Sequence, residues 1–78
     1  MEQKYDLGAI QDTIIQRLIE NQNWDEKKVE VNTEDIDNTI NYYIEGWINQ
    51  TSFSTLNLNE ILDLIETSLA KKHGKGDA

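Results

Sequence analysis

Apolar residues recur at helical spacing in three stretches of the chain, which polar segments separate. The first stretch, residues 7–21, is expected to begin after Asp6, because an aspartate accepts hydrogen bonds from the free N–H groups of a helix start. Ile15 and Ile19 widen its apolar stripe to about 180° of arc, more than a helix on one side of a small core needs. The narrower stripe is formed by Leu7, Ile10, Ile14 and Leu18.

The other two stretches predict two further helices. One begins near Thr33, with Asn32 or Thr33 as its cap, and its stripe is Ile36, Ile40, Tyr43, Ile44, Trp47 and Ile48. The last begins after Asn57, and Glu60, three residues later, completes the pattern of a capping box. Its stripe is Leu58, Ile61, Leu62, Ile65 and Leu69.

Residues 22–32 connect the first two helices, and Trp24 is expected to anchor them to the core. The alternation in Val29-Glu30-Val31 is typical of a short strand, which would need a pairing partner; a plain extended linker is the alternative. The pattern therefore predicts an all-α fold, a small three-helix bundle with at most one short extended segment between the first two helices. Residues 1–73 are expected to form the single domain, and residues 74–78 a disordered tail.

Size and composition limit what could reinforce this domain. With 78 residues the chain buries only about 60–65% of the surface that its unfolded form exposes, so the core is thin. There is no cysteine, one histidine and no metal-ligand spacing, which leaves self-association as the available reinforcement. Neither an apolar leader nor a long apolar run is present, which favours a cytoplasmic protein that does not enter a membrane.

Catalysis and cofactor chemistry are not expected. His73 lies among lysines at the end of the last helix, where a favourable charge at the helix terminus explains it, and no nucleophile is placed beside it. Carrier proteins share this length and acidity, but their Asp-Ser-Leu motif is absent, and Thr67-Ser68-Leu69 is a poor match. We therefore predict a protein that is not an enzyme and holds no cofactor or metal.

Charge is distributed unevenly along the chain. The formal net charge is −8, and residues 29–70 hold eight acidic residues without one lysine or arginine. A nucleic-acid binder needs clustered basic residues to displace counterions from phosphates, so direct binding to DNA or RNA is disfavoured. An ordinary solvated surface mixes both signs, and the missing lysines therefore suggest an acidic face that attracts a basic protein. Its candidate residues are Glu34, Asp37, Glu45, Glu60, Asp63 and Glu66.

Gly46 interrupts the aromatic-rich second helix at the edge of its apolar stripe. Thr39 lies one heptad earlier on the same line, and Tyr42 and Tyr43 flank it as walls of a shallow groove. Packing of another helix of the same chain on this edge is the favoured interpretation. The functional alternative is that the apolar and aromatic residues receive a partner: Ile15, Ile19, Tyr42 and Gly46.

Together these features favour a non-catalytic, acidic protein-binding module. Its most concrete form is an inhibitor or antitoxin-like protein that occupies the basic surface of a nucleic-acid enzyme, as small phage and plasmid proteins do. The 8 asparagines and 10 isoleucines fit an AT-rich genome. The alternative is a homodimer or other homo-oligomeric accessory subunit that uses the first helix for self-association.

Overall fold

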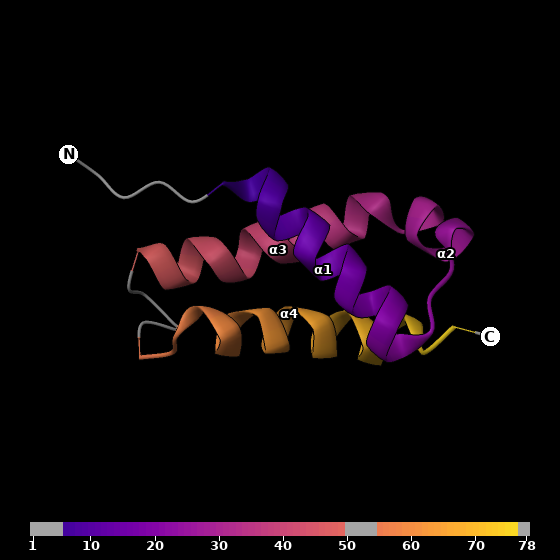
Figure 1. The fold of residues 1–78 in the computed structure, drawn as a ribbon. Helices are drawn as coiled ribbons and strands as arrows, with labels where there is room; N and C mark the ends of the chain where they lie inside the picture. The colour runs from indigo at the N-terminus through magenta and orange to yellow at the C-terminus, as the bar shows by residue number, and fades with distance from the viewer. Residues whose placement is uncertain (1–5, 50–54, 77–78) are drawn as a thin grey trace.

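Four helices make up the fold, and the three long ones form a bundle (Figure 1). The computed structural model describes residues 6–49 and 55–76. Within these residues the helices are α1 (Leu7–Gln22), α2 (Glu26–Val31), α3 (Thr33–Ile48) and α4 (Leu58–His73), and no strand is present. The predicted all-α bundle is confirmed.

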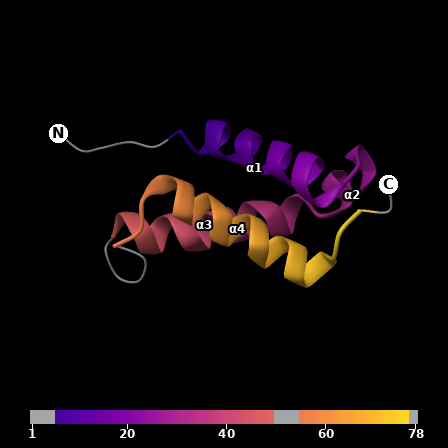
Figure 2. The ribbon, with the colours of Figure 1, turned by 60° about the horizontal axis from the view of Figure 1, so that its bottom comes forward.

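The long helices alternate in direction. The start of α3 lies beside the end of α4, where Asp35 meets His73, so these two helices are antiparallel. α1 runs parallel to α4, because Arg17 bonds to Asp63 and Gln22 to Glu66. α1 crosses obliquely over the other two helices, and α2 lies at the end of the bundle where α1 turns into α3 (Figures 1 and 2).

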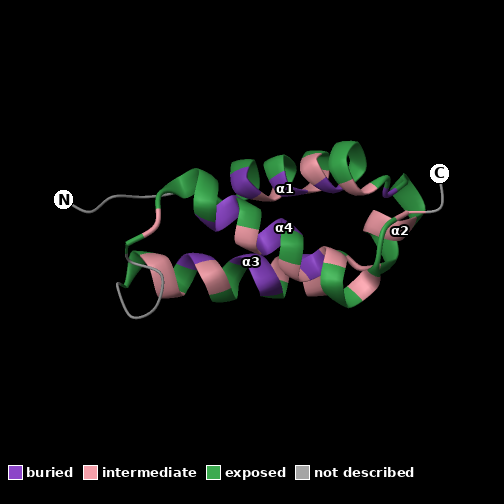
Figure 3. Ribbon diagram, turned by 90° about the horizontal axis from the view of Figure 1, so that it is seen from below, coloured by how far each residue is buried: buried purple, intermediate pink, exposed green. Residues whose placement is uncertain are grey.

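The three predicted stripes meet in one core, drawn purple in Figure 3. Trp24 is buried among them, as expected of an anchor between the first two helices. Three members of the predicted stripes are exposed instead of buried: Leu7 (45%), Ile48 (44%) and Leu58 (37%). The half-buried Tyr43 and Trp47 pack against the core on α3. The buried apolar side chains are Ile10, Ile14, Leu18, Trp24, Ile36, Ile40, Ile44, Ile61, Leu62, Ile65 and Leu69.

At two of the predicted helix starts, the expected side chains cap the helix. Asp6 accepts a hydrogen bond from the Ala9 N–H at 3.2 Å. Asn57 and Glu60 form a reciprocal capping box, with 2.9 Å for each of its two hydrogen bonds. Asn32 occupies the cap position of α3 without a side-chain bond to that helix. Hydrogen bonds of this kind satisfy N–H groups that have no partner within their own helix.

The extended segment predicted at Val29–Val31 is wrong, because these residues end the short helix α2. Asp25 caps this helix by accepting from the Lys28 N–H at 2.8 Å. In a strand the two valines would share a face, whereas a helix separates residues i and i+2 by about 200°. Val29 accordingly packs against the core, while Val31 is 71% exposed.

The end of the chain lies against the junction of α1 and α2. Asn23 ends α1 in the left-handed conformation, which asparagine tolerates. Trp24 Nε1 donates to the Gly74 carbonyl at 2.9 Å, and the Gly76 N–H donates to the Gln22 carbonyl at 2.7 Å. The tail that was predicted to be disordered is therefore bound to the domain at Gly74 and Gly76. Residues 77–78 lie outside the described part, as does Phe53, which was expected near the core.

Candidate interaction surface

The surface of α1 contains two hollows, and the first of them lies between α1 and α3. Gln11 Nε2 donates to Asp37 Oδ1 across the floor of the first. Among the described residues outside its own helix, a Cβ at Gly8 would meet the Asp6 carboxylate, a tight contact at 3.3 Å, and no atom of α2, α3 or α4 within 4 Å. This first hollow has a volume of about 240 Å³ and is lined by Leu7, Gly8, Gln11, Asp37, Ile40 and Asn41.

The second hollow lies further along α1 and is more apolar. Ile15 is half-buried, and Ile19 is 41% exposed at its edge. These are the two isoleucines that widen the stripe of α1 beyond the needs of the core. The hollow has a volume of about 430 Å³ and is lined by Asp12, Ile15, Gln16, Ile19 and Glu20. We refer to the residues that line the two hollows as the α1–α3 face.

Carboxylates surround this apolar surface. Asp12, Glu20 and Asp37 line the hollows, and none of the described lining residues is a lysine or arginine. Glu34 and Glu45 continue the acidic stripe on α3, because positions 34, 37, 41 and 45 are three or four residues apart and therefore share one side of the helix. Of these three carboxylates of α3, Asp37 lines the first hollow and is bonded to Gln11 of α1, whereas Glu34 and Glu45 line neither hollow.

The carboxylates of α4 have other roles. Glu66 is only 7% exposed and accepts hydrogen bonds from three side chains of α1. The donor–acceptor distances are 2.8 Å from Gln22, 3.2 Å from Arg17 and 3.4 Å from Asn21. A buried carboxylate needs such donors, because it has lost its water. Glu66 therefore belongs to the contact between α1 and α4 and not to an open acidic surface.

Asp63 and Glu60 are also engaged within the domain. Arg17 lies 2.6 Å from the Asp63 carboxylate, on the opposite side of α1 from Ile15 and Ile19. Hydrogen bonding to Asp63, and then to Glu66, raises the pKa of the Arg17 guanidinium above its ordinary value, although desolvation by burial opposes this shift. Glu60 caps α4. The structure does not bring these α4 residues to the α1–α3 face.

Asp35, at the start of α3, is neutralised by the end of α4. Its carboxylate lies 2.6 Å from His73 Nε2 and 3.3 Å from Lys72 Nζ. The hydrogen bond with His73 is the main cause that lowers the pKa of Asp35, and Lys72 adds to it against the opposing effect of burial. The basic end of α4 thus compensates the negative charge of α3 only on the side that faces α4.

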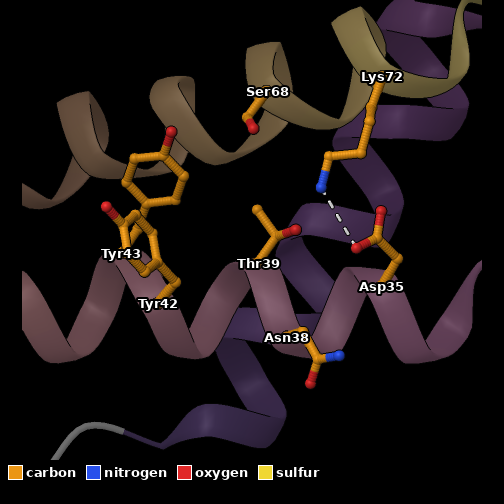
Figure 4. Close-up of a pocket in the computed structure, with 7 residues that line it drawn as sticks. All are labelled: Asp35, Asn38, Thr39, Tyr42, Tyr43, Ser68 and Lys72. Carbon is orange, nitrogen blue, oxygen red and sulfur yellow. Dashed lines mark hydrogen bonds and ion pairs between the residues drawn. The ribbon is translucent and has the colours of Figure 1, made fainter.

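A third hollow, of about 280 Å³, lies between α3 and α4 (Figure 4). Tyr42 and Tyr43 stand at one end, with their ring centroids 5.2 Å apart and nearly perpendicular. Lys72 and Asp35 close the other end. The hollow is polar and holds both signs of charge, unlike the α1–α3 face. Its lining residues are Asp35, Asn38, Thr39, Tyr42, Tyr43, Ser68 and Lys72.

The edge predicted around Gly46 coincides with this third hollow. Thr39, one of the small residues on that edge, is buried, and Ser68 lies across from it on α4 (Figure 4). Gly46 is half-buried one turn beyond the two tyrosines. α4 therefore packs along this edge of α3 near Thr39, whereas the packing predicted at Gly46 itself stays a prediction.

Sequence reasoning proposed only Asp37, Ile15 and Ile19 of the α1–α3 face as site residues. It missed Leu7, Gly8, Gln11, Ile40 and Asn41 in the first hollow, and Asp12, Gln16 and Glu20 in the second. The signal was present in the chain. Asp12, Ile15, Gln16, Ile19 and Glu20 are spaced by three, one, three and one residues, which places two carboxylates beside the two surplus isoleucines on one side of a helix.

Comparisons with known proteins identify no relative: the chain matches no protein-family model, and neither the curated proteins nor the solved structures give a significant match. In residues 6–49 and 55–76 no helix has the length and apolar character needed to cross a lipid bilayer. The same residues hold no group of three or more His, Asp or Glu side chains that could bind a metal ion.

Proposed function

We propose that the protein is a non-catalytic, acidic protein-binding module that occupies a basic, nucleic-acid-handling surface of a partner protein, in the manner of an inhibitor or antitoxin. The observation that carries this proposal is the composition of the α1–α3 face. Two hollows with exposed apolar side chains are lined by three carboxylates, and their described lining includes no basic residue.

Each component of this face has a role in association. Apolar anchors such as Ile19 supply affinity when a partner covers them. Carboxylates around the anchors attract a cationic surface and repel polyanions, which favours a basic protein over nucleic acid itself. Because this attraction is screened over about 8 Å at physiological ionic strength, association should slow as salt is added.

Charge-neutral variants test the proposal with a matched control. Glu34→Gln/Glu45→Gln removes two exposed carboxylates that share one side of α3 with Asp37 of the face, and Glu26→Gln/Glu30→Gln removes two from α2. Basic proteins captured by the immobilised wild-type protein are purified, and their nucleic-acid binding is measured with each variant present. We expect the wild type and the α2 variant to compete with nucleic acid, and the α3 variant to compete several-fold less. Equal competition by the two double variants would remove the α3 carboxylates from the proposal.

Self-association is the second candidate, because Leu7 and Ile19 are large apolar side chains left exposed near the two hollows. A symmetric dimer through this face would bring the carboxylates of one copy against those of the other, which opposes pairing. Sedimentation equilibrium decides between the two candidates. A monomer at micromolar concentration supports binding to a partner, whereas a stable dimer that Ile19→Asp dissociates supports the accessory-subunit alternative.

A further inference from the structure

We infer that the α1–α3 face binds a single amphipathic, cationic helix of the partner, which lies along α1 as an additional helix of the bundle. This inference rests on the proposed function and specifies the shape and chemistry of the partner segment. Three observations carry it: the separation of the two hollows, the open space over Gly8, and the sign of the surrounding charge.

The separation of the hollows matches one side of a helix. Gly8 in the first hollow and Ile15 in the second are seven residues apart on α1, which is about 10.5 Å at 1.5 Å per residue. Side chains at positions i and i+7 of a partner helix share one side and are separated by the same distance. Gly8, Asp12, Ile15 and Ile19 are spaced by four, three and four residues, so they form one line along α1 that a neighbouring helix can follow. A helix with apolar anchors at i and i+7 therefore fits.

Gly8 keeps the first hollow open. Apart from its own helix, the nearest atom to a Cβ built there is the Asp6 carboxylate oxygen at 3.3 Å. Within residues 6–49 and 55–76 no other helix lies against this glycine, although a Cβ there would crowd the Asp6 carboxylate that caps α1. A glycine in a helix costs about 1 kcal/mol relative to alanine, and less in the first turn. The missing side chain at Gly8 therefore lowers the stability of α1 slightly. An incoming side chain can occupy the space that a larger residue would fill.

The sign of the charge selects a cationic partner over a second copy of this chain. Asp12 and Glu20 flank the second hollow and Asp37 lies in the first. Arg17 cannot compensate them, since it projects from the other side of α1 and is bonded to Asp63 and Glu66. Lysine or arginine residues beside the two anchors of a partner helix would meet these carboxylates, as in the helix-in-groove mode of peptide recognition.

The test uses a designed probe and measures its affinity by fluorescence anisotropy. The probe is a labelled helical peptide of roughly five turns with leucine at i and i+7 and lysine on the flanking positions. A second peptide has the same composition with one leucine moved to the opposite side of the helix, and a third carries glutamate in place of lysine. We expect the first peptide to bind about tenfold or more tightly than the second, and the third not to bind.

Variants of the protein then locate the site. Gly8→Leu fills the first hollow and Ile19→Ser removes the apolar edge of the second, and each should weaken the first peptide by about tenfold. Val31→Ser is the matched control, because it removes an exposed apolar residue that lines neither hollow, and it should bind like the wild type. Circular dichroism verifies the fold of each variant. If Gly8→Leu does not fold, Gly8→Ala replaces it in the experiment, because alanine favours a helix. Its methyl group should also weaken the binding of the first peptide.

The outcomes separate the two proposals. Equal affinity for the first two peptides would overturn the helix inference, while binding of both above the acidic peptide would leave the proposed function standing. Failure of every lysine-rich probe to bind at low salt would overturn the inference, and the competition of the captured basic proteins with nucleic acid would then decide the proposed function. Unchanged affinity in Gly8→Leu and Ile19→Ser, with both folded, would place the binding site elsewhere and overturn the inference.

Discussion

The side chain of Gln22, the last residue of α1, donates to the buried carboxylate of Glu66 on α4, with 2.8 Å between Nε2 and Oε2. Arg17 reaches the other oxygen of the same carboxylate from one turn earlier. Together these contacts fix the position of α1 along α4. They also explain why the open side of α1 is the one beside α3, since the polar side chains on its other flank are already engaged.

Replacing Glu66 should destabilise the domain strongly. Glu66→Ala leaves Arg17, Asn21 and Gln22 without a buried acceptor, and we expect a loss of about 2–4 kcal/mol in the free energy of unfolding. Asp63→Ala removes the other carboxylate that bonds to Arg17, but the Asp63 side chain is 67% exposed, so its loss should stay below about 1 kcal/mol. Urea denaturation followed by circular dichroism measures both. Equal losses of stability in Glu66→Ala and Asp63→Ala would show that the buried Glu66 contributes no more than the exposed Asp63.

The helical state of residues 26–31 predicts different effects at its two valines. Val29→Ala removes methyl groups that pack on the core, and we expect it to cost about 1 kcal/mol. Val31→Ala changes an exposed side chain and should remain within about 0.5 kcal/mol of the wild type. Thermal denaturation of the two variants side by side measures the difference. Two equal, substantial losses would instead indicate that both valines share one packed face, as they would in a strand.

Stability should fall in acid through Asp35. Its pKa is lowered in the folded protein from the ordinary value of 3.8, mainly by the hydrogen bond with His73. A lowered carboxyl pKa contributes stability above the ordinary value, and this contribution is lost as the pH falls through the folded pKa. Asp35→Asn should therefore be less stable than the wild type near neutral pH and lose less stability below about pH 4. Urea midpoints at several pH values provide the measurement.

A second variant identifies the cause of that profile. His73→Ala removes the main hydrogen bond and leaves Lys72, so it should flatten the acid-dependent loss in the same direction as Asp35→Asn. Identical acid profiles for the wild type and both variants would show that the contact between α3 and the end of α4 contributes nothing to the pH dependence.

The close approach of Gly76 to α1 is also testable. A Cβ at this position would overlap the Asn23 carbonyl, so Gly76→Ala should break the hydrogen bond from the Gly76 N–H to Gln22. The cost should be about 1 kcal/mol, the usual worth of one hydrogen bond. Amide chemical shifts of residues 22–24 should change in Gly76→Ala and stay close to those of the wild type in Lys75→Ala. Unchanged shifts in Gly76→Ala would mean that the tail is not held there.

Local signals in the sequence predicted most of the fold, because they act within a few residues. The Asp6 cap, the Asn57–Glu60 capping box and the spacing of the isoleucines each depend on neighbours one helical turn away. The helix α2 was missed because two valines two residues apart suggested a strand. Asp25, which comes before them, is a residue type that often caps the start of a helix, and it caps α2. Alternation over three residues is too short to outweigh such a cap.

The candidate site was harder to predict, since it depends on contacts between distant residues. Nothing near Glu66 in sequence indicates that it is buried, because its donors precede it by more than 40 residues. The same holds for Asp35, whose partners lie at the other end of the chain. Charge counted along the sequence therefore placed on α4 an acidic surface, although Glu66 is buried and Asp63 is bonded to Arg17. The surplus apolar width of α1 corresponds to the half-buried Ile15 and the exposed Ile19.

The opposite placement of the two ends of α1 has a practical consequence. The chain enters this helix at Asp6, beside the space over Gly8, whereas Gly76 lies at the far end against Gln22, more than 20 Å away along a helix of 16 residues. A fusion or affinity tag attached ahead of α1 would start at the end of the helix that holds Gly8 of the proposed binding face. One attached after the final glycine would leave it open, so purification handles and surface-immobilisation linkers belong at the carboxyl end.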